Sequence, residues 1–178
     1  DRWWTSDVEK IHVVGKGIAR FHAVYWIAFL LSAGLPLPSR VFVHDYLTVD
    51  GAKIAKSGAQ AADPFSVIKT YGVDAVRWWL LRDPAPAGTT DFTIDRLIAR
   101  YNNDLANTVG NLVSRTLTLA RKRPRSVGST TVEPLGPGGL ALLAAARALP
   151  AEIDGALARY DFRSACESIQ ELAARANR

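Results

Sequence analysis

The chain has 178 residues, a formal net charge of +5 at pH 7 and a mean hydropathy of +0.02, and 48% of its residues are hydrophobic. This composition is typical of a globular protein and excludes a mainly disordered chain. The single cysteine, Cys166, excludes a disulfide framework and disfavours a zinc site with four Cys and His ligands. The longest apolar run, residues 23–33, is far shorter than the roughly 20 residues that cross a bilayer, and no cationic leader precedes it, so we expect a cytoplasmic protein without a membrane partner.

The first part of the chain predicts a parallel α/β unit. Residues 11–14 form a short apolar run that predicts a strand, and residues 18–33 have helical character. Residues 40–44 are β-branched and aromatic, which predicts a second buried strand. A strand–helix–strand unit of this length favours a parallel pair with a right-handed crossover. Residues 46–51 then predict a short extended piece that ends in an Asp-Gly turn.

The middle of the chain predicts helices separated by two loops. Residues 53–62 and 84–88 are the loops, and a short helix is expected over residues 75–82. Asp63 and Pro64 predict an N-cap and the first position of another helix. A long amphipathic helix is expected from residue 93 to about residue 122. Its predicted buried face consists of Ile98, Tyr101, Leu105, Val109, Leu112, Thr116 and Leu119.

The last part of the chain predicts a linker and two more helices. Residues 123–138 are rich in Pro, Gly, Ser and Thr, and a helix follows over 139–160, bent or interrupted at Pro150. A third helix is expected over 163–178, so that an antiparallel helical bundle follows the α/β unit. The chain contains no methionine, even at position 1, and its last residues continue a helical pattern. We therefore expect it to be a piece of a longer protein.

Two lysines follow the predicted second strand. Lys53 and Lys56 lie three residues apart on a loop rich in Gly and Ala, at the carboxyl end of a strand, where open α/β sheets bind ligands. Their ammonium groups could reach phosphate oxygens, although the spacing is not that of a Walker loop. Two solvated surface lysines are the alternative.

Two further groups of residues share helix faces. Ile18 and His22 are four residues apart on one face, where a histidine is more often a hydrogen-bonded core residue than a ligand-binding one. Asp104, Asn111 and Arg115 line one flank of the long helix, with Lys122 one step further. Asn and Arg side chains can bond and stack on the bases of single-stranded RNA. A polar contact between helices is the alternative.

Taken in this order, the segments resemble methionyl-tRNA synthetases, which are class I aminoacyl-tRNA synthetases. Residues 11–26, IHVVGKGIARFHAVYW, are similar to the family segment H-x-I-G-K-D-I-x-R-F-H-x-x-Y-W. Residues 53–57, KIAKS, stand where the family has Lys-Met-Ser-Lys-Ser. Further similar segments are residues 63–64 and 71–77, which follow that signature, and residues 102–107 with 110–115, in the first helix of the anticodon-binding bundle.

The resemblance implies a fold class of α/β plus all-α that is mostly helical overall. Residues 1–62 would be the second half of a Rossmann-like catalytic domain, residues 63–92 a stem-contact linker, and residues 93–178 a truncated anticodon-binding bundle. The family activates methionine with ATP and Mg²⁺ and transfers the methionyl group to tRNA. The implied partners are ATP, methionine, tRNA and the missing N-terminal half of the same polypeptide, and no zinc site is expected within this segment.

The resemblance also assigns roles to individual residues. Lys53, Lys56 and Ser57 would be catalytic, with the lysines steadying the triphosphate as pyrophosphate leaves. Gly15 and His44 would join the two lysines in binding ATP. The remaining implied sites are a methionine side-chain pocket at Ile18 and His22 and an anticodon contact at Asn111 and Arg115.

Several residues depart from the family pattern on the nucleotide side. Gly17 stands where the family has an Asp, and Asp45, a new negative charge near the expected phosphates, replaces a Gly. The other departures are Ile54, Ala55, Ala59 and Gln60. The family signature His-Ile-Gly-His is absent from these residues, so we do not expect this segment alone to activate an amino acid.

Three readings therefore stay open. The chain could belong to a working synthetase, or to a paralogue that binds tRNA or activates another small molecule. It could also be an unrelated helical RNA-binding module that follows an α/β unit.

Overall fold

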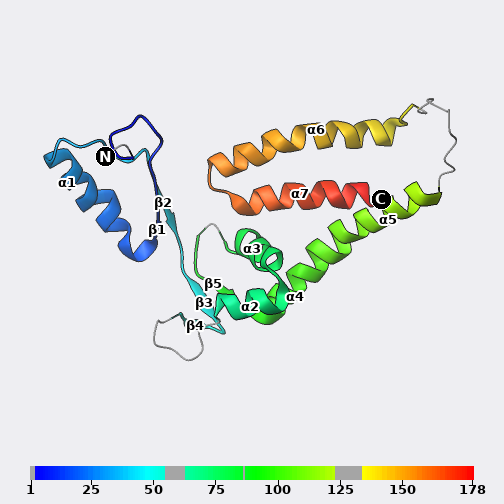
Figure 1. Cartoon of the computed structure of the whole chain (residues 1–178), viewed down its shortest axis with the longest axis horizontal. Helices are drawn as coiled ribbons and strands as arrows, with labels where there is room; N and C mark the ends of the chain where they lie inside the picture. Colours follow the sequence, from blue (N-terminus) through cyan, green and yellow to red (C-terminus); the bar gives the residue numbers. More distant parts are fainter. Residues whose placement is uncertain (1–2, 55–62, 86, 123–133) are drawn as a thin grey trace.

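The computed structural model describes residues 3–54, 63–85, 87–122 and 134–178, and within them the chain is mostly helical with two small sheets. A strand pair and its crossover helix form one end of the molecule, and three long helical segments form the other (Figure 1). A short helical hairpin lies between them. No helix in these ranges combines the length and the apolarity that a membrane span needs.

The first sheet is a parallel pair of β1, Ile11–Gly15, and β2, Arg40–His44. The crossover is helical but not uniform. It runs through a 3-10 turn, Lys16–Ile18, a π-helical turn, Phe21–Tyr25, and α1, Trp26–Ser32. Both the strand–helix–strand order and the parallel pairing predicted for this part of the chain are confirmed.

The second sheet is built around β3, Leu47–Val49, which pairs antiparallel with β4, Ala52–Lys53. The two residues between them, Asp50 and Gly51, both have positive φ, 49° and 75°, as a tight hairpin turn requires. The predicted Asp-Gly turn is thus confirmed. The sequence did not indicate β5, Thr90–Phe92, which pairs parallel with β3.

The helical hairpin consists of α2, Pro64–Tyr71, and α3, Val73–Arg82. Asp63 caps α2 as predicted, because its carboxylate accepts the N–H groups of Phe65 and Ser66 at 3.2 and 3.1 Å. The main core lies between this hairpin and the helix that follows β5, and in it Trp79 and Leu97 have no exposed surface. The other buried members are Val67, Ala75 and Val76.

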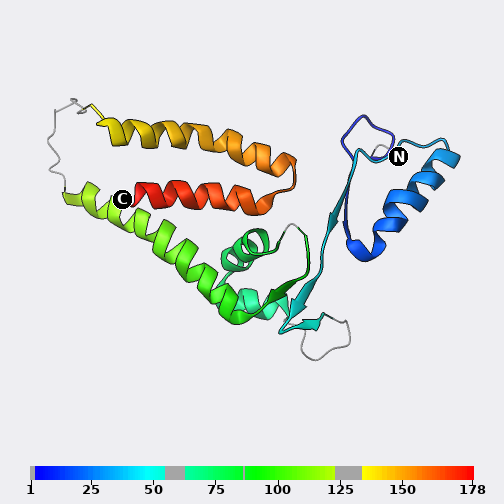
Figure 2. The ribbon, with the colours of Figure 1, turned by 180° about the vertical axis from the view of Figure 1, so that it is seen from behind.

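The predicted long helix is continuous but changes geometry along its length. It comprises α4, Ile94–Arg100, a π-helical segment, Tyr101–Gly110, and α5, Asn111–Lys122. After residues 123–133, which lie outside the described ranges, α6, Pro137–Ala158, runs antiparallel to α7, Phe162–Ala176. Both views place α7 between α6 and the long helix (Figures 1 and 2).

Two expectations for these helices need correction. Of the bend or interruption predicted at Pro150, the interruption is wrong, because α6 continues through this residue. The buried face predicted for the long helix is not buried throughout, since Tyr101 is 44% and Leu119 65% exposed, and the buried residues are Leu97 and Asp104. The reason is that periodicity shows which residues share a face, whereas burial depends on what packs against it. No residue of α5, all of which is described, is buried.

Candidate functional site

The carboxyl ends of β1 and β2 lie side by side, since Gly15 pairs with His44 in the register of the sheet. The two chains leave the sheet there as Lys16-Gly17 and Asp45-Tyr46. We call Gly15, Lys16, Gly17, His44, Asp45 and Tyr46 the strand-end site. The carboxyl edge of a parallel sheet is where such folds bind ligands, so these residues are placed for ligand contact.

An ion pair crosses the strand-end site. The Lys16 Nζ atom lies 2.8 Å from Asp45 Oδ1, and Asp45 Oδ2 accepts the Gly88 N–H at 2.8 Å. The hydrogen bond from Lys16 lowers the pKa of the Asp45 carboxyl, and the same bond raises the pKa of the Lys16 ammonium. Both groups are therefore charged at neutral pH, and the negative charge that Asp45 introduces is balanced by Lys16.

The strand-end site also brings together two of the predicted ATP-binding residues. A Cβ on Gly15 would lie 3.6 Å from His44 Cε1, so the two residues are in contact distance. The His44 ring is oriented by its Nδ1–H, which donates to the carbonyl oxygen of Asp45 at 2.9 Å. That bond leaves Nε2 as the ring nitrogen free to face a ligand.

The predicted lysine loop is placed only at its beginning. Lys53 ends β4, where its backbone pairs with Thr48. Lys56 and Ser57 lie outside the described residues, and so do Ala55, Ala59 and Gln60. The hairpin that leads to the loop is held by Asp91 of β5, whose Oδ1 accepts the Gly51 N–H at 2.8 Å.

The two residues predicted for a methionine pocket lie next to each other. The Nδ1–H of His22 donates to the carbonyl oxygen of Ile18 at 3.0 Å, and Ile18 is 49% exposed. The His22 ring lies 5.8 Å from the His12 ring, which makes edge contacts with Trp4 and Trp26. We call Trp4, His12, His22 and Trp26 the ring cluster.

Sequence reasoning missed three members of the ring cluster. Trp26 could have been found, because it is four residues after His22 on the same helical face. Trp4 and His12 carry no local signal, since tertiary packing brings them to the crossover. The described residues offer no hydrogen-bond partner to the buried Nε1 atoms of Trp4 and Trp26 or to Nε2 of His12.

The predicted anticodon residues meet the end of α7. The Asn111 side chain donates to Asn177 Oδ1 at 3.2 Å, and Arg115 donates to the carbonyl oxygen of Asn177. Asn177 in turn donates to the Thr108 carbonyl at 2.9 Å. In this structure Asn111 and Arg115 thus make the helix–helix contact that was the alternative to RNA binding.

Asp104, on the same predicted flank, is a clear helix contact. It is 8% exposed and accepts the indole N–H of Trp78 at 3.0 Å.

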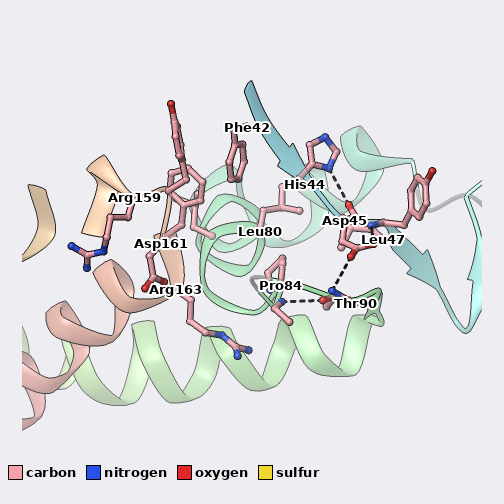
Figure 3. Close-up of a pocket in the computed structure, with 16 residues that line it drawn as sticks. Phe42, His44, Asp45, Leu47, Leu80, Pro84, Thr90, Arg159, Asp161 and Arg163 are labelled. Atoms are coloured by element: carbon pink, nitrogen blue, oxygen red, sulfur yellow. Dashed lines mark hydrogen bonds between the residues drawn. The ribbon is translucent and has the colours of Figure 1, made fainter. Parts of the chain in front are cut away.

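A cavity of about 540 Å³ connects the strand-end site to the helical end of the molecule. Figure 3 shows His44 and Asp45 at one end of this cavity and Arg159 and Asp161 at the other. Its wall includes Phe42, whose ring stacks on the Tyr160 ring at 4.5 Å between centroids. Its volume is within the range of small-molecule sites.

The family comparison gives a match over most of the chain. The family model described as "tRNA synthetases class I (M)" matches residues 1–117. The methionine–tRNA ligase of Nostoc sp. is 40% identical over 99% of this chain and 33% of its own length. That of Thermotoga maritima is 47% identical over 68% of this chain and 19% of its own length.

Solved structures give the same result. Mycobacterium tuberculosis methionyl-tRNA synthetase in complex with methionyl-adenylate matches 99% of this chain at a TM-score of 0.87 and 36% identity. Its apo form matches 94% at a TM-score of 0.80 and 34% identity. The chain covers 34% and 32% of those two structures, and about a third of the Nostoc relative.

Proposed function

Since the chain belongs to the methionyl group of the class I tRNA synthetases, we propose that it is one portion of a methionine–tRNA ligase. The complete protein would activate methionine with ATP and Mg²⁺ to methionyl-adenylate and transfer the methionyl group to tRNA, in the cytoplasm. The observation that carries this proposal is the family match over residues 1–117, which includes the strand-end site and the lysine loop. The similar structure that holds methionyl-adenylate supports it.

The proposed parts are the second half of a Rossmann-like catalytic domain, residues 1–62, a stem-contact region, 63–92, and the beginning of an anticodon-binding bundle, 93–178. The pairing of β3 with β5 crosses the first of these boundaries, so the first two regions share a sheet. The antiparallel arrangement of α6 and α7 supports the bundle.

The remainder of the catalytic domain would pack on the open side of β1. Within the described residues β1 pairs with β2 alone, which leaves its other edge available for a further strand. Ile11 and Val13, on β1, are 44% and 63% exposed. Apolar side chains next to an open edge are typical of a surface that another strand or layer covers. We propose that the N-terminal half of the same polypeptide covers it.

In the proposed reaction the lysines act by electrostatics. The γ- and β-phosphates leave as pyrophosphate, and negative charge grows on the bridging oxygen as they do. Lys53, at the end of β4, and Lys56, three residues later in the sequence, would stabilise that charge, and Ser57 would bond the phosphates. Gly15 and His44 would contact the nucleotide at the strand ends, where Gly15 lets it approach the backbone.

The methionine side chain would lie against Ile18 and the ring cluster. A thioether makes favourable contacts with aromatic edges at a sulfur-to-ring distance of about 5 Å. His22 and Trp26 come from the crossover and Trp4 from the segment before β1, so the pocket is assembled from two parts of the chain.

The proposal is tested on the complete protein by methionine-dependent ATP–pyrophosphate exchange. We expect exchange in the native protein and a loss of at least about 100-fold when Lys53→Ala and Lys56→Ala are combined, as for other groups that stabilise developing charge. Lys69→Ala is the matched control, because Lys69 is exposed on α2. No exchange together with retained tRNA binding would instead support a redirected paralogue.

The anticodon contact has its own control, since Arg115 bonds Asn177. If Arg115 reads RNA, Arg115→Ala should weaken tRNA binding at least about tenfold, as a charge-assisted contact of 1.5–3 kcal/mol predicts. Asn177→Ala removes the side-chain bonds of Asn177 to Asn111 and Thr108 but keeps both Arg115 and the backbone carbonyl that Arg115 bonds, so it should change tRNA affinity less than about twofold. Equal losses in the two variants would mean that tRNA binding depends on the contact between α5 and α7 and not on an Arg115–RNA bond.

A further inference from the structure

The turn between α6 and α7 contains a tyrosine where the backbone favours glycine. The Tyr160 N–H donates to the Leu157 carbonyl oxygen and the Asp161 N–H to the Ala156 carbonyl oxygen, both at 2.9 Å. This is the Schellman arrangement of a helix C-terminus, in which the residue at the position of Tyr160 has left-handed dihedrals and is usually glycine. Tyr160 has a φ of 58°, and an aromatic side chain there costs conformational free energy that glycine avoids. Such a cost is retained where the side chain itself is needed.

The Tyr160 ring packs against the first sheet. It stacks on the ring of Phe42 of β2, with 4.5 Å between the centroids and 23° between the planes. Phe162, the first residue of α7, meets the same Phe42 ring edge-on at 6.0 Å. Arg40 lies two residues before Phe42 on the same face of β2, and its Nη1 donates to the Ala158 carbonyl oxygen at the end of α6 at 3.0 Å. We call these five residues the turn contact.

The stack depends on the aromatic ring of Tyr160 and not on its hydroxyl group. The Tyr160 Oη atom is buried and has no hydrogen-bond partner among the residues that the structure describes. A phenyl ring would make the same stack without leaving a polar atom unsatisfied. Ring packing on Phe42 is therefore the contribution that offsets the backbone cost at residue 160.

The turn contact is a second link between α7 and the rest of the molecule. Arg163, near the start of α7, already joins this helix to the residue after α3, since it donates to the Asp83 carbonyl oxygen at 2.8 Å. The turn contact joins α7 to the first sheet instead, and both views show the α6–α7 turn at the side of the helical end that faces β2 (Figures 1 and 2). Two links at separate points oppose a rotation of the helical end that either link alone would permit.

The orientation of the helical end relates two of the proposed binding sites. Phe42 and His44 lie on the same face of β2, and both line the cavity of about 540 Å³. The proposed anticodon residues, Asn111 and Arg115, bond Asn177 just after α7. The helix α7 thus runs from the turn contact, next to His44 on the sheet, to the proposed anticodon contact.

We propose that Tyr160 and Phe42 are positioning residues for the transfer step: their stack sets the orientation of the tRNA-binding helical end relative to the catalytic half. This inference rests on the proposed function. Transfer uses tRNA, which would contact both parts of the molecule, whereas ATP and methionine would contact only the catalytic half. The stack should therefore matter for transfer to tRNA and not for methionine activation.

The first experiment compares three substitutions of Tyr160 in the complete protein. Tyr160→Ala and Tyr160→Gly both remove the ring, and only glycine also removes the backbone cost. Both should lower kcat for methionylation of tRNA by about 2- to 12-fold, the range for one lost aromatic pair, and change methionine-dependent pyrophosphate exchange less than twofold. Tyr160→Phe keeps the ring and should keep both rates. A loss of transfer in Tyr160→Phe equal to that in Tyr160→Ala would overturn the role of the ring.

Melting temperature separates positioning from local stability. Tyr160→Gly should melt above Tyr160→Ala, because glycine fits the left-handed backbone without strain. Since both variants lack the same ring, they should be equally impaired in transfer although they differ in stability. If transfer instead follows the melting temperature, so that glycine restores it relative to alanine, the turn acts through its stability and the inference is wrong.

A double-substitution cycle tests the partner of the ring. Phe42→Leu combined with Tyr160→Gly should lower transfer no more than the more severe of the two single substitutions does, because both remove one contact. Losses that multiply would overturn the stack as their common cause. Normal exchange together with unchanged transfer in Tyr160→Gly would overturn the inference and leave the proposed function intact. No exchange in the native protein would refute the proposed function, and the inference with it.

Discussion

Asp83 should be the most sensitive polar residue for the stability of the helical part. It follows α3, and its side chain is only 5% exposed. Its carboxylate lies 2.7 Å from Arg100 Nε and 2.6 Å from Arg96 Nη2, and its carbonyl oxygen accepts from Arg163 at 2.8 Å. One residue therefore links α3 to α4 through its side chain and to α7 through its backbone.

The expected cost of Asp83→Asn follows from the burial of each partner. Removing one member of a fully buried ion pair costs about 3–5 kcal/mol, whereas exposed pairs contribute about 0–1 kcal/mol. Here the carboxylate is buried, but the Arg96 and Arg100 side chains are 45% and 31% exposed, so water screens them in part. We expect a loss of about 2 kcal/mol, which lowers the melting temperature by about 4–8 °C for a unit of this size.

The measurement is thermal unfolding followed by tryptophan fluorescence, because Trp78 and Trp79 lie on α3 next to Asp83. Asp154→Asn, in the exposed part of α6, removes the same charge and should shift the melting temperature by less than about 1 °C. Equal melting temperatures for Asp83→Asn and the native protein would refute the reasoning, since they would mean that the arginines lose nothing when the carboxylate becomes an amide.

Three further substitutions test other parts of the fold by unfolding measurements. Asp161→Ala should cost about 1 kcal/mol at neutral pH, because Asp161 caps α7. Hydrogen bonds from the Ser164 side chain and N–H lower the pKa of Asp161. The stabilisation by this cap is therefore present above the ordinary pKa of an Asp and is lost as the pH falls through the lowered value. The native and variant melting curves should converge in acid. Trp79→Ala should cost about 3–5 kcal/mol, since the ring is fully buried and lies edge-on to Phe92 at 4.8 Å; a loss under about 1 kcal/mol in urea unfolding would contradict that packing. Pro150→Ala should raise stability by about 1–3 kcal/mol, because it restores an N–H inside α6, and a lowered melting temperature would show that the proline is needed there.

Elements that are determined by local chemistry could be predicted from the sequence. The first N–H groups of a helix have no partner within the helix. Asp63 accepts hydrogen bonds from two of them, and Pro64 has no N–H group, so both residues mark the beginning of α2 whatever packs on it. Asp50 and Gly51 tolerate positive φ, which is the condition for the β3–β4 turn.

Elements that depend on distant residues could not be predicted. Thr90–Phe92 is too short to show a period, and it is a strand only because β3 lies beside it. The exposure of Leu119 has the same origin, because the described residues place too little chain over that end of α5 to cover it. Spacing defines a helix face, and tertiary packing decides whether the face is buried.

The strand-end site falls between these cases. Gly17 and Asp45 were recognised as departures, but their meaning depends on the register of β1 and β2. Once Gly15 is paired with His44, the next residues on each chain, Lys16 and Asp45, become neighbours, and so do Gly17 and Tyr46. Because of this register, the carboxylate of Asp45 forms an ion pair with Lys16, and the Tyr46 hydroxyl lies beside Gly17.

The same sheet that carries the lysine hairpin also starts the long helix. Asp91 of β5 accepts from Thr48 at 2.5 Å and from Gly51 at 2.8 Å, while its carbonyl oxygen accepts from Arg96 of α4 at 2.7 Å. Two residues after Asp91, Thr93 caps α4 by accepting the Arg96 N–H at 3.2 Å. The hairpin, β5 and the first turn of α4 are therefore held in one continuous set of hydrogen bonds. Asp91 is thus one of the links, together with the backbone pairing of β3 and β5, that position the lysine hairpin relative to the start of α4, and β5 provides them although it carries no sequence signal.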